Sequence, residues 1–497
     1  MKATHNNMIH HRRKGAWAST LRLIAISVCC VAATASCDDW LDVTPKTNID
    51  EEDLFRNEQG FKEALTGIYI TMGNTSLYGR EMTYGFIDQL AQRYVNSASS
   101  TADYDKATWY TFPSTRTEAH YTAFWSGHYN LIANINNLLA NIDERGDVIT
   151  TDGYRDLIKG EALGLRSFLY LDLLRMFGPI YKDNPTSPAI PYRTRFDRDV
   201  RKLMPANQVC DSLIASLKEA ESLLADDPMN ISFPASGAVG GDQFLCHRFN
   251  RMNKYAVKAV MARAYLWKGD KANALLKARE VIDARKQGGG LMFSLITDNT
   301  QDKIGSTELL FSLSMDSETF ADRVAEEFQI TNWNYYIVTD VDRLYKMWDV
   351  AADGQNDMRL KDGTGFSITT NGAYTLKYRQ EGLLSPLLKD NMPLVRLPEM
   401  YYIVAECTDD MAEAANMLST VRSARGVEEL DAFATEKQRT EALEKEYRKE
   451  FYAEGQLWFF YKRHAYKTFL FCPVANMSEA NYRFAIPDDE TVLGNIN

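Results

Sequence analysis

Hydrophobic residues recur every three to four positions along most of the chain, which is the spacing of amphipathic helices. Polar, Gly- and Pro-containing stretches separate these periodic segments and mark turns between helices. The pattern indicates a mainly α protein in which successive helices pack side by side. Helices of this kind are predicted over residues 48–69, 122–142, 205–224 and 440–454.

One segment, residues 157–177, is apolar nearly all round and stops at Gly178-Pro179. A helix without a polar face is buried on most of its sides, so this segment is expected at the centre of the core. Asp172 and Arg175 lie three residues apart within it. We expect them to form a structural ion pair between packed helices, rather than a catalytic one.

Residues 250–284 form the clearest supersecondary unit of the sequence. Two helical patterns with small residues at the contact positions flank a turn at Gly269-Asp270, and together they resemble one tetratricopeptide repeat of ~34 residues. Residues 398–406 and 411–425 predict a second such pair. Repeats bury their faces only against neighbours, so the expected body is a superhelix of stacked helix pairs.

The segment between these pairs, about residues 290–395, breaks the helical pattern. Residues 311–314 and 374–378 alternate between apolar and polar like short strands, among many loop residues. We therefore expect an irregular, loop-rich insertion with minor β structure within a single domain that spans residues 37–497.

The N-terminus carries an export signal. A basic stretch, residues 10–22, precedes an apolar run over residues 23–36, too short for a bilayer span of ~20 residues. Residues 1–36 are thus expected to be a signal peptide. Small residues just before Cys37 resemble the lipobox of bacterial lipoproteins, which implies cleavage before Cys37 and its lipidation. The alternative is ordinary cleavage, with Cys37 incidental.

Charge excludes one class of function. Fifty-six basic and 67 acidic residues give −11 for the 497-residue chain, and residues 1–36 contain five basic and no acidic ones. The rest has a net charge of −16, which argues against nucleic-acid binding, because phosphate affinity needs clustered Lys and Arg. Arg193, Arg195, Arg198 and Arg201 form one local basic patch against this acidic mean.

Motifs for chemistry are absent from the sequence. The histidines form no HExxH, and no nucleophile elbow, P-loop or dinucleotide motif occurs. Asp349, Asp353 and Asp357 lack the EF-hand spacing, so neither metal nor cofactor is expected. A pair of carboxylates for glycoside hydrolysis stays open, because it needs no sequence motif. The disulfide state also stays open for Cys210, Cys246, Cys407 and Cys472.

Two loop-like segments are dense in aromatic residues, which offer flat apolar faces with polar tips. We take these rings as the candidate ligand-binding residues, with Arg93 as a nearby hydrogen-bond donor; the alternative is that they fill the core under long loops. Trp125, Trp267, Trp348 and Trp458 lie in helical patterns and are expected in the core. The candidates are Trp109 and Tyr110 in one segment, and Trp333, Tyr335 and Tyr336 in the other.

Placed in order, these pieces resemble the SusD/RagB family of outer-membrane nutrient-binding lipoproteins. In the C-terminal block Leu457 and Phe460 replace the family's usual Arg and Asp, so packing is expected there in place of polar pairing. The similar blocks are residues 36–45, 51–55, 166–178 (ending Leu-Leu-Arg-Met-Phe-Gly), the hairpin at 264–270, 394–406 (starting Leu-Val-Arg-Leu-Pro-Glu), 450–463 and the terminal Ile486-Pro487 with Glu490.

The resemblance implies a tetratricopeptide-like body, a loop-rich binding face and no catalytic residues. It also implies a surface-exposed lipoprotein of the outer membrane that captures a nutrient, usually a glycan and sometimes a peptide. The implied partner is a TonB-dependent, SusC-like β-barrel transporter. Two alternatives stay open, an exported helical glycosidase and a protein-binding helical-repeat scaffold.

Overall fold

The computed structural model describes residues 51–95, 109–110, 115–229, 242–330, 338–379 and 389–492. The chain divides into two units, Met1–Arg56 and Asn57–Asn497. The described part of the first unit holds one short helix, α2 (Glu51–Leu54). No helix in the described ranges is long and apolar enough to cross a membrane. The signal peptide and Cys37 lie outside the described residues.

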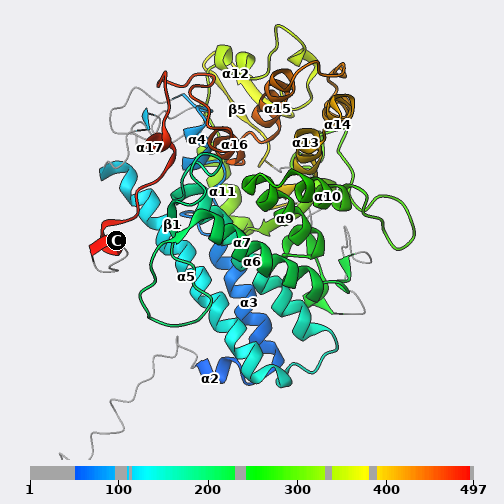
Figure 1. Cartoon of the computed structure of the whole chain (residues 1–497). Coiled ribbons are helices and arrows are strands. Elements are labelled where there is room, and N and C mark those ends of the chain that lie inside the picture. Colours follow the sequence, from blue (N-terminus) through cyan, green and yellow to red (C-terminus); the bar gives the residue numbers. More distant parts are fainter. Residues whose placement is uncertain are drawn as a thin grey trace, which may run out of the picture. The chain divides into compact units, whose positions relative to one another are not determined.

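The second unit is built from pairs of neighbouring helices, which lie side by side in Figure 1. The helices of each pair pack on each other, and each pair packs on the next through α5 and α6, α7 and α9, and α10 and α13. The predicted mainly α, helix-pair body is confirmed. The pairs are α3 (Glu58–Met72) with α5 (Thr115–Arg145), α6 (Tyr154–Phe177) with α7 (Ala206–Leu223), α9 (Lys254–Lys268) with α10 (Lys271–Ile282), and α13 (Leu397–Cys407) with α14 (Met411–Ala424).

The boundaries differ from the predicted ones where polar residues decide them. The first predicted helix is split at Asn57, whose side chain accepts a hydrogen bond from the Gly60 N–H and so begins α3. Helix α5 begins at Thr115, seven residues before the predicted start, in a polar stretch that has no apolar period. In the α9–α10 hairpin, Gly269 takes a left-handed φ of 85°, as the predicted turn requires.

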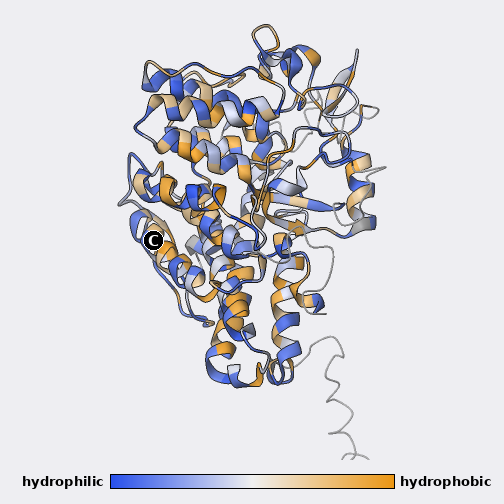
Figure 2. Cartoon of the chain, turned by 90° about the vertical axis from the view of Figure 1, so that its right-hand side faces the viewer, coloured by the Kyte–Doolittle hydropathy of each residue, from blue (hydrophilic) through white to orange (hydrophobic). Residues whose placement is uncertain are grey.

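Helix α6 is the core helix, as its all-round hydrophobicity predicted. From Ile158 to Phe177 all but one of its residues are buried. Figure 2 shows hydrophobic and hydrophilic residues interspersed along the helices of the body. Two glycines allow close approach of its neighbours. A Cβ atom on Gly160 would lie 2.7 Å from Leu224, and one on Gly164 would lie 2.5 Å from Met252. Any larger residue there would push α6 away from those chains.

Asp172 and Arg175 of α6 form the predicted ion pair. Arg175 Nε donates to Asp172 Oδ1 at 3.0 Å, and Tyr78 donates to Asp172 Oδ2 at 2.7 Å. The helix end is closed from a distant segment, because Lys462 Nζ donates to the carbonyl oxygens of Arg175 and Gly178 at 2.7 and 2.8 Å. These carbonyls have no partner within the helix, so the ammonium group satisfies them and complements the helix dipole.

Lys462 belongs to α16 (Gln456–His464), which packs on α15 (Glu436–Glu450). Leu457 and Phe460 of this helix are buried, and the Phe460 ring lies 4.7 Å from that of Tyr447. Packing therefore takes the place of polar pairing at these two positions, as expected.

Residues 290–395 contain more order than the alternation patterns indicated. Strand β3 (Leu309–Ser314) pairs antiparallel with β6 (Asn391–Arg396), and both pack on α9. The two ends of this region thus belong to the core, and the loops lie between them. The other elements are β4 (Phe366–Thr369) paired with β5 (Gly372–Thr375), and the unpredicted helices α11 (Ser317–Glu327) and α12 (Val341–Met347).

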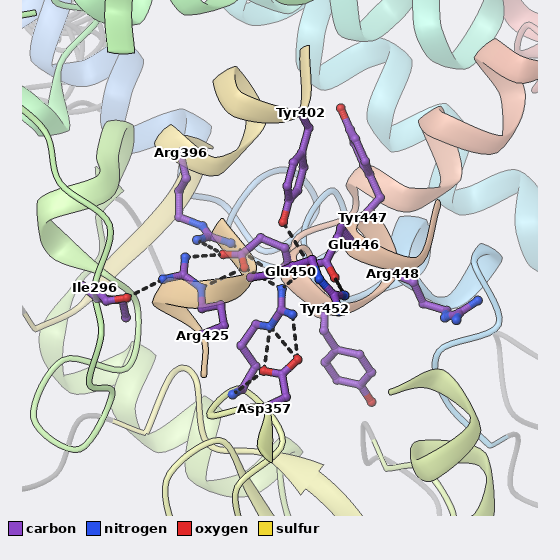
Figure 3. Close-up of polar contacts among 12 residues, drawn as sticks. Ile296, Asp357, Arg396, Tyr402, Arg425, Glu446, Tyr447, Arg448, Glu450 and Tyr452 are labelled. Carbon is purple, nitrogen blue, oxygen red and sulfur yellow. Dashed lines mark hydrogen bonds and ion pairs between the residues drawn. The ribbon is translucent and has the colours of Figure 1, made fainter. Parts of the chain in front are cut away.

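A buried network of ion pairs joins this region to the helix stack. Figure 3 shows Arg396 and Arg425 directed toward Glu450. Arg396 Nη1 lies 2.6 Å from Glu450 Oε1, and Arg425 Nη2 lies 2.9 Å from the same oxygen. Glu308, just before β3, binds both arginines at 2.9 and 2.8 Å. Burial alone would raise the pKa of Glu450, but Arg425, Arg396 and Arg359 hold that pKa well below its ordinary value.

Two more arginines extend the network. Arg359 Nη1 contacts Glu450 at 2.9 Å and Glu446 at 3.1 Å, and Arg422 Nη1 contacts Glu446 at 2.9 Å. Buried charges of this kind are stable only when every member finds its partners. The network therefore ties together α14, α15, β6 and the loop that contains Arg359.

Removal of one central cation should destabilise the protein strongly. We expect Arg396→Gln to lower the free energy of unfolding by about 3–5 kcal/mol, because the carboxylates of Glu308, Glu450 and Glu454 lose a buried partner. Urea unfolding followed by circular dichroism measures this. Lys437→Gln, in an exposed pair with Glu441, is the control and should change stability by less than about 0.5 kcal/mol. A loss below about 1 kcal/mol for Arg396→Gln would contradict a central role.

The contacts of Glu58 predict a pH-dependent contribution to stability. Its carboxylate accepts the Thr151 N–H at 2.9 Å and pairs with Lys62 at 2.9 Å. Burial opposes ionisation, yet Lys62 and Thr151 lower the pKa of Glu58 from 4.5 to about 2. A lowered pKa stabilises the fold above the unfolded-state value, and this contribution fades as the pH falls from about 5 toward 2.

Glu58→Gln should therefore be less stable than the parent by about 1 kcal/mol near neutral pH, and the difference should shrink on acidification. Thermal unfolding of both proteins at several pH values measures it. Glu441→Gln, which changes an exposed carboxylate of α15, should show no such trend. Parallel stability curves for Glu58→Gln and the parent would rule out the linkage.

Candidate functional site

The predicted aromatic segments are only partly described by the structure. Trp109 is 54% exposed at the surface. Trp333, Tyr335 and Tyr336 lie outside the described residues, so their role stays a prediction. Trp125, Trp267, Trp348 and Trp458 are buried, which confirms their assignment to the core.

A backbone contact holds together the places where these two segments leave the described chain. Val95 N donates to Val338 O at 2.9 Å. Residue 95 precedes the first segment, and residue 338 follows the second. Nearby, Arg343 Nη2 donates to Gln92 O at 2.8 Å, and Gln92 Nε2 donates to the Tyr110 hydroxyl at 2.8 Å. We call the Val95–Val338 contact and these two bonds the loop clamp.

Tyr110 is a buried member of the loop clamp and is not exposed at the protein surface. Its side chain is 1% exposed, its ring stacks on Trp458 at 5.3 Å and 10°, and its hydroxyl donates to Leu90 O at 2.7 Å. In this geometry its ring is covered by protein on all sides. The neighbouring Trp109 therefore remains the described ring of this segment that a ligand can reach.

Arg93, which we expected to offer donors to a ligand, is placed elsewhere. It is fully buried, its guanidinium lies 5.1 Å from the centre of the Tyr452 ring, and it donates to the carbonyl of Arg448. That prediction is wrong, because the chain around residue 93 is buried and its arginine contacts α15, which the loop-like local sequence does not reveal.

A surface hollow lies between the elements that flank the aromatic segments. It has a volume of about 410 Å³. One wall is the start of α5, which follows Trp109 and Tyr110 in the chain; another is the end of α11, which precedes Trp333. We call this site the polar hollow. Its lining residues are Thr75, Ser76, Arg80, Glu81, Ala119, His120, Ala123, Arg323 and Glu327.

Charges in the polar hollow balance one another. Arg80 Nε lies 2.7 Å from Glu327 Oε1, and Arg80 also pairs with Glu81. Arg323 Nε donates to the Tyr84 hydroxyl at 3.1 Å. Burial raises the pKa of the Glu327 carboxyl, while Arg80 opposes that rise. Two arginines and two glutamates give a neutral site rich in donors and acceptors, a chemistry that suits uncharged hydroxyl groups.

His120 belongs to this wall, but His128 does not. The His120 ring stacks on Phe86 with centroids 4.7 Å apart and an angle of 24°. His128, eight residues later, is fully buried between Tyr78 and the Phe124 carbonyl, at 3.1 and 2.7 Å. The two rings therefore do not form a common site.

Most residues of the polar hollow were not predicted. Arg80 and Glu81 lie in a segment without motif, and Arg80 meets Glu327 across more than 240 residues of sequence. Arg323 and Glu327 lie in α11, where buried Phe320 and Val324, with Phe328 just after the helix, recur every four residues; this helical spacing was the signal that could have located them.

The structure also accounts for the acidic residues considered as metal ligands. Asp349 pairs with Arg448 at 3.1 Å, and Asp357 pairs with Arg359 at 2.7 Å. Asp353 pairs with Arg422. Within the described ranges, no group of three or more His, Cys, Asp or Glu residues is arranged to hold a metal ion. Cys210, Cys246, Cys407 and Cys472 are free thiols.

Solved structures share this fold. A SusD superfamily protein from Bacteroides thetaiotaomicron superposes with a TM-score of 0.67 at 21% identity, over 88% of this chain and 98% of the other. A structure titled as a laminarin-binding SusD-like protein gives a TM-score of 0.60 at 15% identity, over 88% of this chain and 97% of the other. At such identities the likeness concerns the fold.

Sequence comparisons agree with the fold. SusD-like protein P2 of Formosa agariphila is 23% identical over 248 residues, which are 50% of this chain and 43% of that protein. The chain thus matches less than half the length of this curated relative. The family model described as "Starch-binding associating with outer membrane" matches residues 39–241, and the model described as "SusD family" matches residues 262–491. Together the two models span most of the sequence, and the chain belongs to the SusD/RagB family.

Proposed function

We propose that this protein is a surface-exposed lipoprotein of the outer membrane that binds an oligosaccharide and delivers it to a TonB-dependent, SusC-like transporter. In this proposal Cys37 carries the lipid anchor, and the ligand is held by shape and hydrogen bonds without being transformed.

The anchor follows from the N-terminal sequence. A basic stretch, a short apolar run and small residues before Cys37 fit export followed by lipidation. The family model that matches residues 39–241 is described as associating with the outer membrane, which supports the same location. Stable attachment takes more than one acyl chain, as a lipidated N-terminal cysteine provides.

The loop clamp carries the binding proposal. It joins residues 95 and 338, which adjoin the two aromatic-rich segments and lie about 240 positions apart in sequence. The polar hollow is walled by the helix that follows the first segment in the chain and by the helix that precedes the second. Sugars present apolar C–H faces and many hydroxyl groups, so they match aromatic rings next to paired donors and acceptors. The name of the laminarin-binding relative supports a glycan as the class of ligand.

The transporter enters as a partner because of the family resemblance and the anchor. A protein tethered at its N-terminus on the outer membrane can act as a lid over a barrel, with a hinge-type motion that traps the ligand. Capture and release of the ligand then depend on contact with the barrel and not on a chemical step.

The glycosidase alternative needs a pair of carboxylates, and the polar hollow contains one such pair. Glu81 and Glu327 both line the polar hollow, and both bind Arg80. The Arg80 guanidinium takes one oxygen of each carboxylate, Oε1 of Glu81 and Oε1 of Glu327, which leaves fewer oxygens to act as acid and base on a substrate. Release of reducing ends from a glycan panel by the purified protein would favour this alternative, and a partner protein without any glycan binding would favour the scaffold.

The exposed ring of Trp109 should contribute to affinity. For the secreted chain from Asp38 onward, we expect Trp109→Ala to weaken binding of laminarihexaose about tenfold, because a sugar face loses its aromatic surface. Isothermal titration calorimetry measures the affinity. Leu276→Ala, at an exposed apolar position of α10, is the matched control and should bind like the parent. Equal affinity of the Trp109→Ala variant would exclude this ring from the site.

The anchor should depend on one thiol. In cells fed an alkyne-tagged fatty acid, Cys37→Ala should remove the label and release the protein from the outer-membrane fraction. The parent, but not this variant, should also copurify with a β-barrel transporter from detergent-solubilised membranes. Cys246→Ala, which changes a free thiol of the mature chain, should keep both label and location. Unchanged labelling of the Cys37→Ala protein would refute the anchor.

A further inference from the structure

A second depression lies on another side of α5. It is a groove of about 270 Å³ between α5 and the loop, residues 191–203, that joins the antiparallel strands β1 (Pro188–Ile190) and β2 (Met204–Pro205). Trp125, Tyr129 and Asn136 of α5 form one wall. All four residues of the basic patch, Arg193, Arg195, Arg198 and Arg201, line the other wall. We call this site the arginine groove.

The base of the arginine groove is firmly held. The Tyr129 hydroxyl donates to Pro191 O at 2.7 Å, and the Tyr170 hydroxyl lies 2.6 Å from Arg193 N and 2.8 Å from Arg193 O. The Asn136 side chain, itself bound to buried Arg166 at 2.8 Å, donates to Arg193 O at 3.3 Å. Side chains of two core helices thus fix the loop before any ligand binds, which lowers the entropic cost of binding.

The loop is positively charged on an acidic protein. Residues 191–203 contain five basic and two acidic side chains, a net charge of +3, whereas the whole chain has −11. Asp197 holds Arg201 at 2.7 Å and Arg193 at 3.5 Å, and so orients these two guanidinium groups. Glu490, near the C-terminus, also lines the groove and reduces the net positive charge there.

Arg195 and Arg198 differ from the other two arginines. Both are exposed, and neither forms an ion pair with any residue that the structure describes. Phe196 and Val200 beside them are 54% and 57% exposed, among the most exposed large apolar side chains described. Arginine forks bind carboxylate and sulfate groups in a bidentate manner, and an aromatic face next to them suits an apolar sugar face.

We propose that the arginine groove binds the carboxylate or sulfate group of an acidic saccharide through Arg195 and Arg198. This inference rests on the proposed function, because it takes the cargo to be a glycan, and it adds an anionic substituent as the feature that a second site recognises.

The size of the groove favours a saccharide over a protein partner. A stable protein–protein contact buries about 800 Å² on each partner, whereas a hollow of a few hundred Å³ suits a small ligand. The arginine groove is also distinct from the polar hollow. Its α5 residues 125, 129 and 136 form one stripe of the helix, while 119, 120 and 123 lie on another side, about 15 Å away along the axis.

The test compares anionic and neutral hexasaccharides on the full lipoprotein in detergent micelles. The probes are hexagalacturonate, a sulfated carrageenan hexasaccharide and laminarihexaose, measured by isothermal titration calorimetry. We expect Arg195→Gln/Arg198→Gln to weaken binding of at least one anionic probe by about tenfold or more and to leave laminarihexaose binding unchanged. Raising salt from about 50 to 200 mM should weaken only the anionic probes. The two anionic probes distinguish a carboxylate from a sulfate as the recognised group.

Lys202→Gln is the matched control, since Lys202 is a basic residue of the same loop that does not line the groove; it should change affinity less than about twofold. Equal melting temperatures would show that both variants are folded. Anionic probes that bind the double variant as well as the parent, or no tighter than laminarihexaose, would overturn the inference while the proposed function stands.

Two other results separate the remaining possibilities. Arginine-dependent binding of a hexaglutamate peptide, with no effect on any saccharide, would assign the groove to a protein partner and overturn the inference. Failure of all three saccharides to bind the parent would refute the proposed function together with the inference.

Discussion

The described structure depends on the ion pairs that the buried carboxylate of Glu450 forms with three arginines. The three arginines, from β6, from the position just after α14 and from the loop after α12, converge on this carboxylate, and each would be costly to bury alone. Because no subset of these charges is satisfied by itself, the strands, the last helix pair and α15 must assemble together. The network therefore makes the long, irregular region between α10 and α13 part of the same cooperative core as the helix stack.

This constraint gives a physical reason for the blocks that resemble the SusD/RagB family. Arg396 in one block binds Glu450 and Glu454 in another, and Arg463 binds Glu406 across the same pair of blocks. Lys462 closes the end of α6, which is itself a block. The similar segments thus contribute opposite partners to the same buried polar contacts. Each segment leaves buried charges without a partner unless the other segment is present.

Much of the helical body could be predicted from the sequence, because amphipathic spacing is a local property. The central helix α6, the α9–α10 hairpin with its Gly269 turn and the Asp172–Arg175 pair all follow from a few neighbouring residues. The β3–β6 ribbon and the Glu450 network join residues far apart in the chain, and nothing in either segment alone predicts its partner. Of the predicted binding residues, Trp109 is exposed and its role in binding stays a prediction, while Tyr110 and Arg93 are covered by tertiary packing that a single sequence does not reveal.

The Val95–Val338 hydrogen bond has an evolutionary consequence. Because it joins main-chain atoms, it does not depend on which side chains the two valines carry. Either valine can therefore be exchanged for another residue while the link between these two distant parts of the chain is kept. A contact encoded by the backbone in this way tolerates sequence drift that a contact between two specific side chains would not.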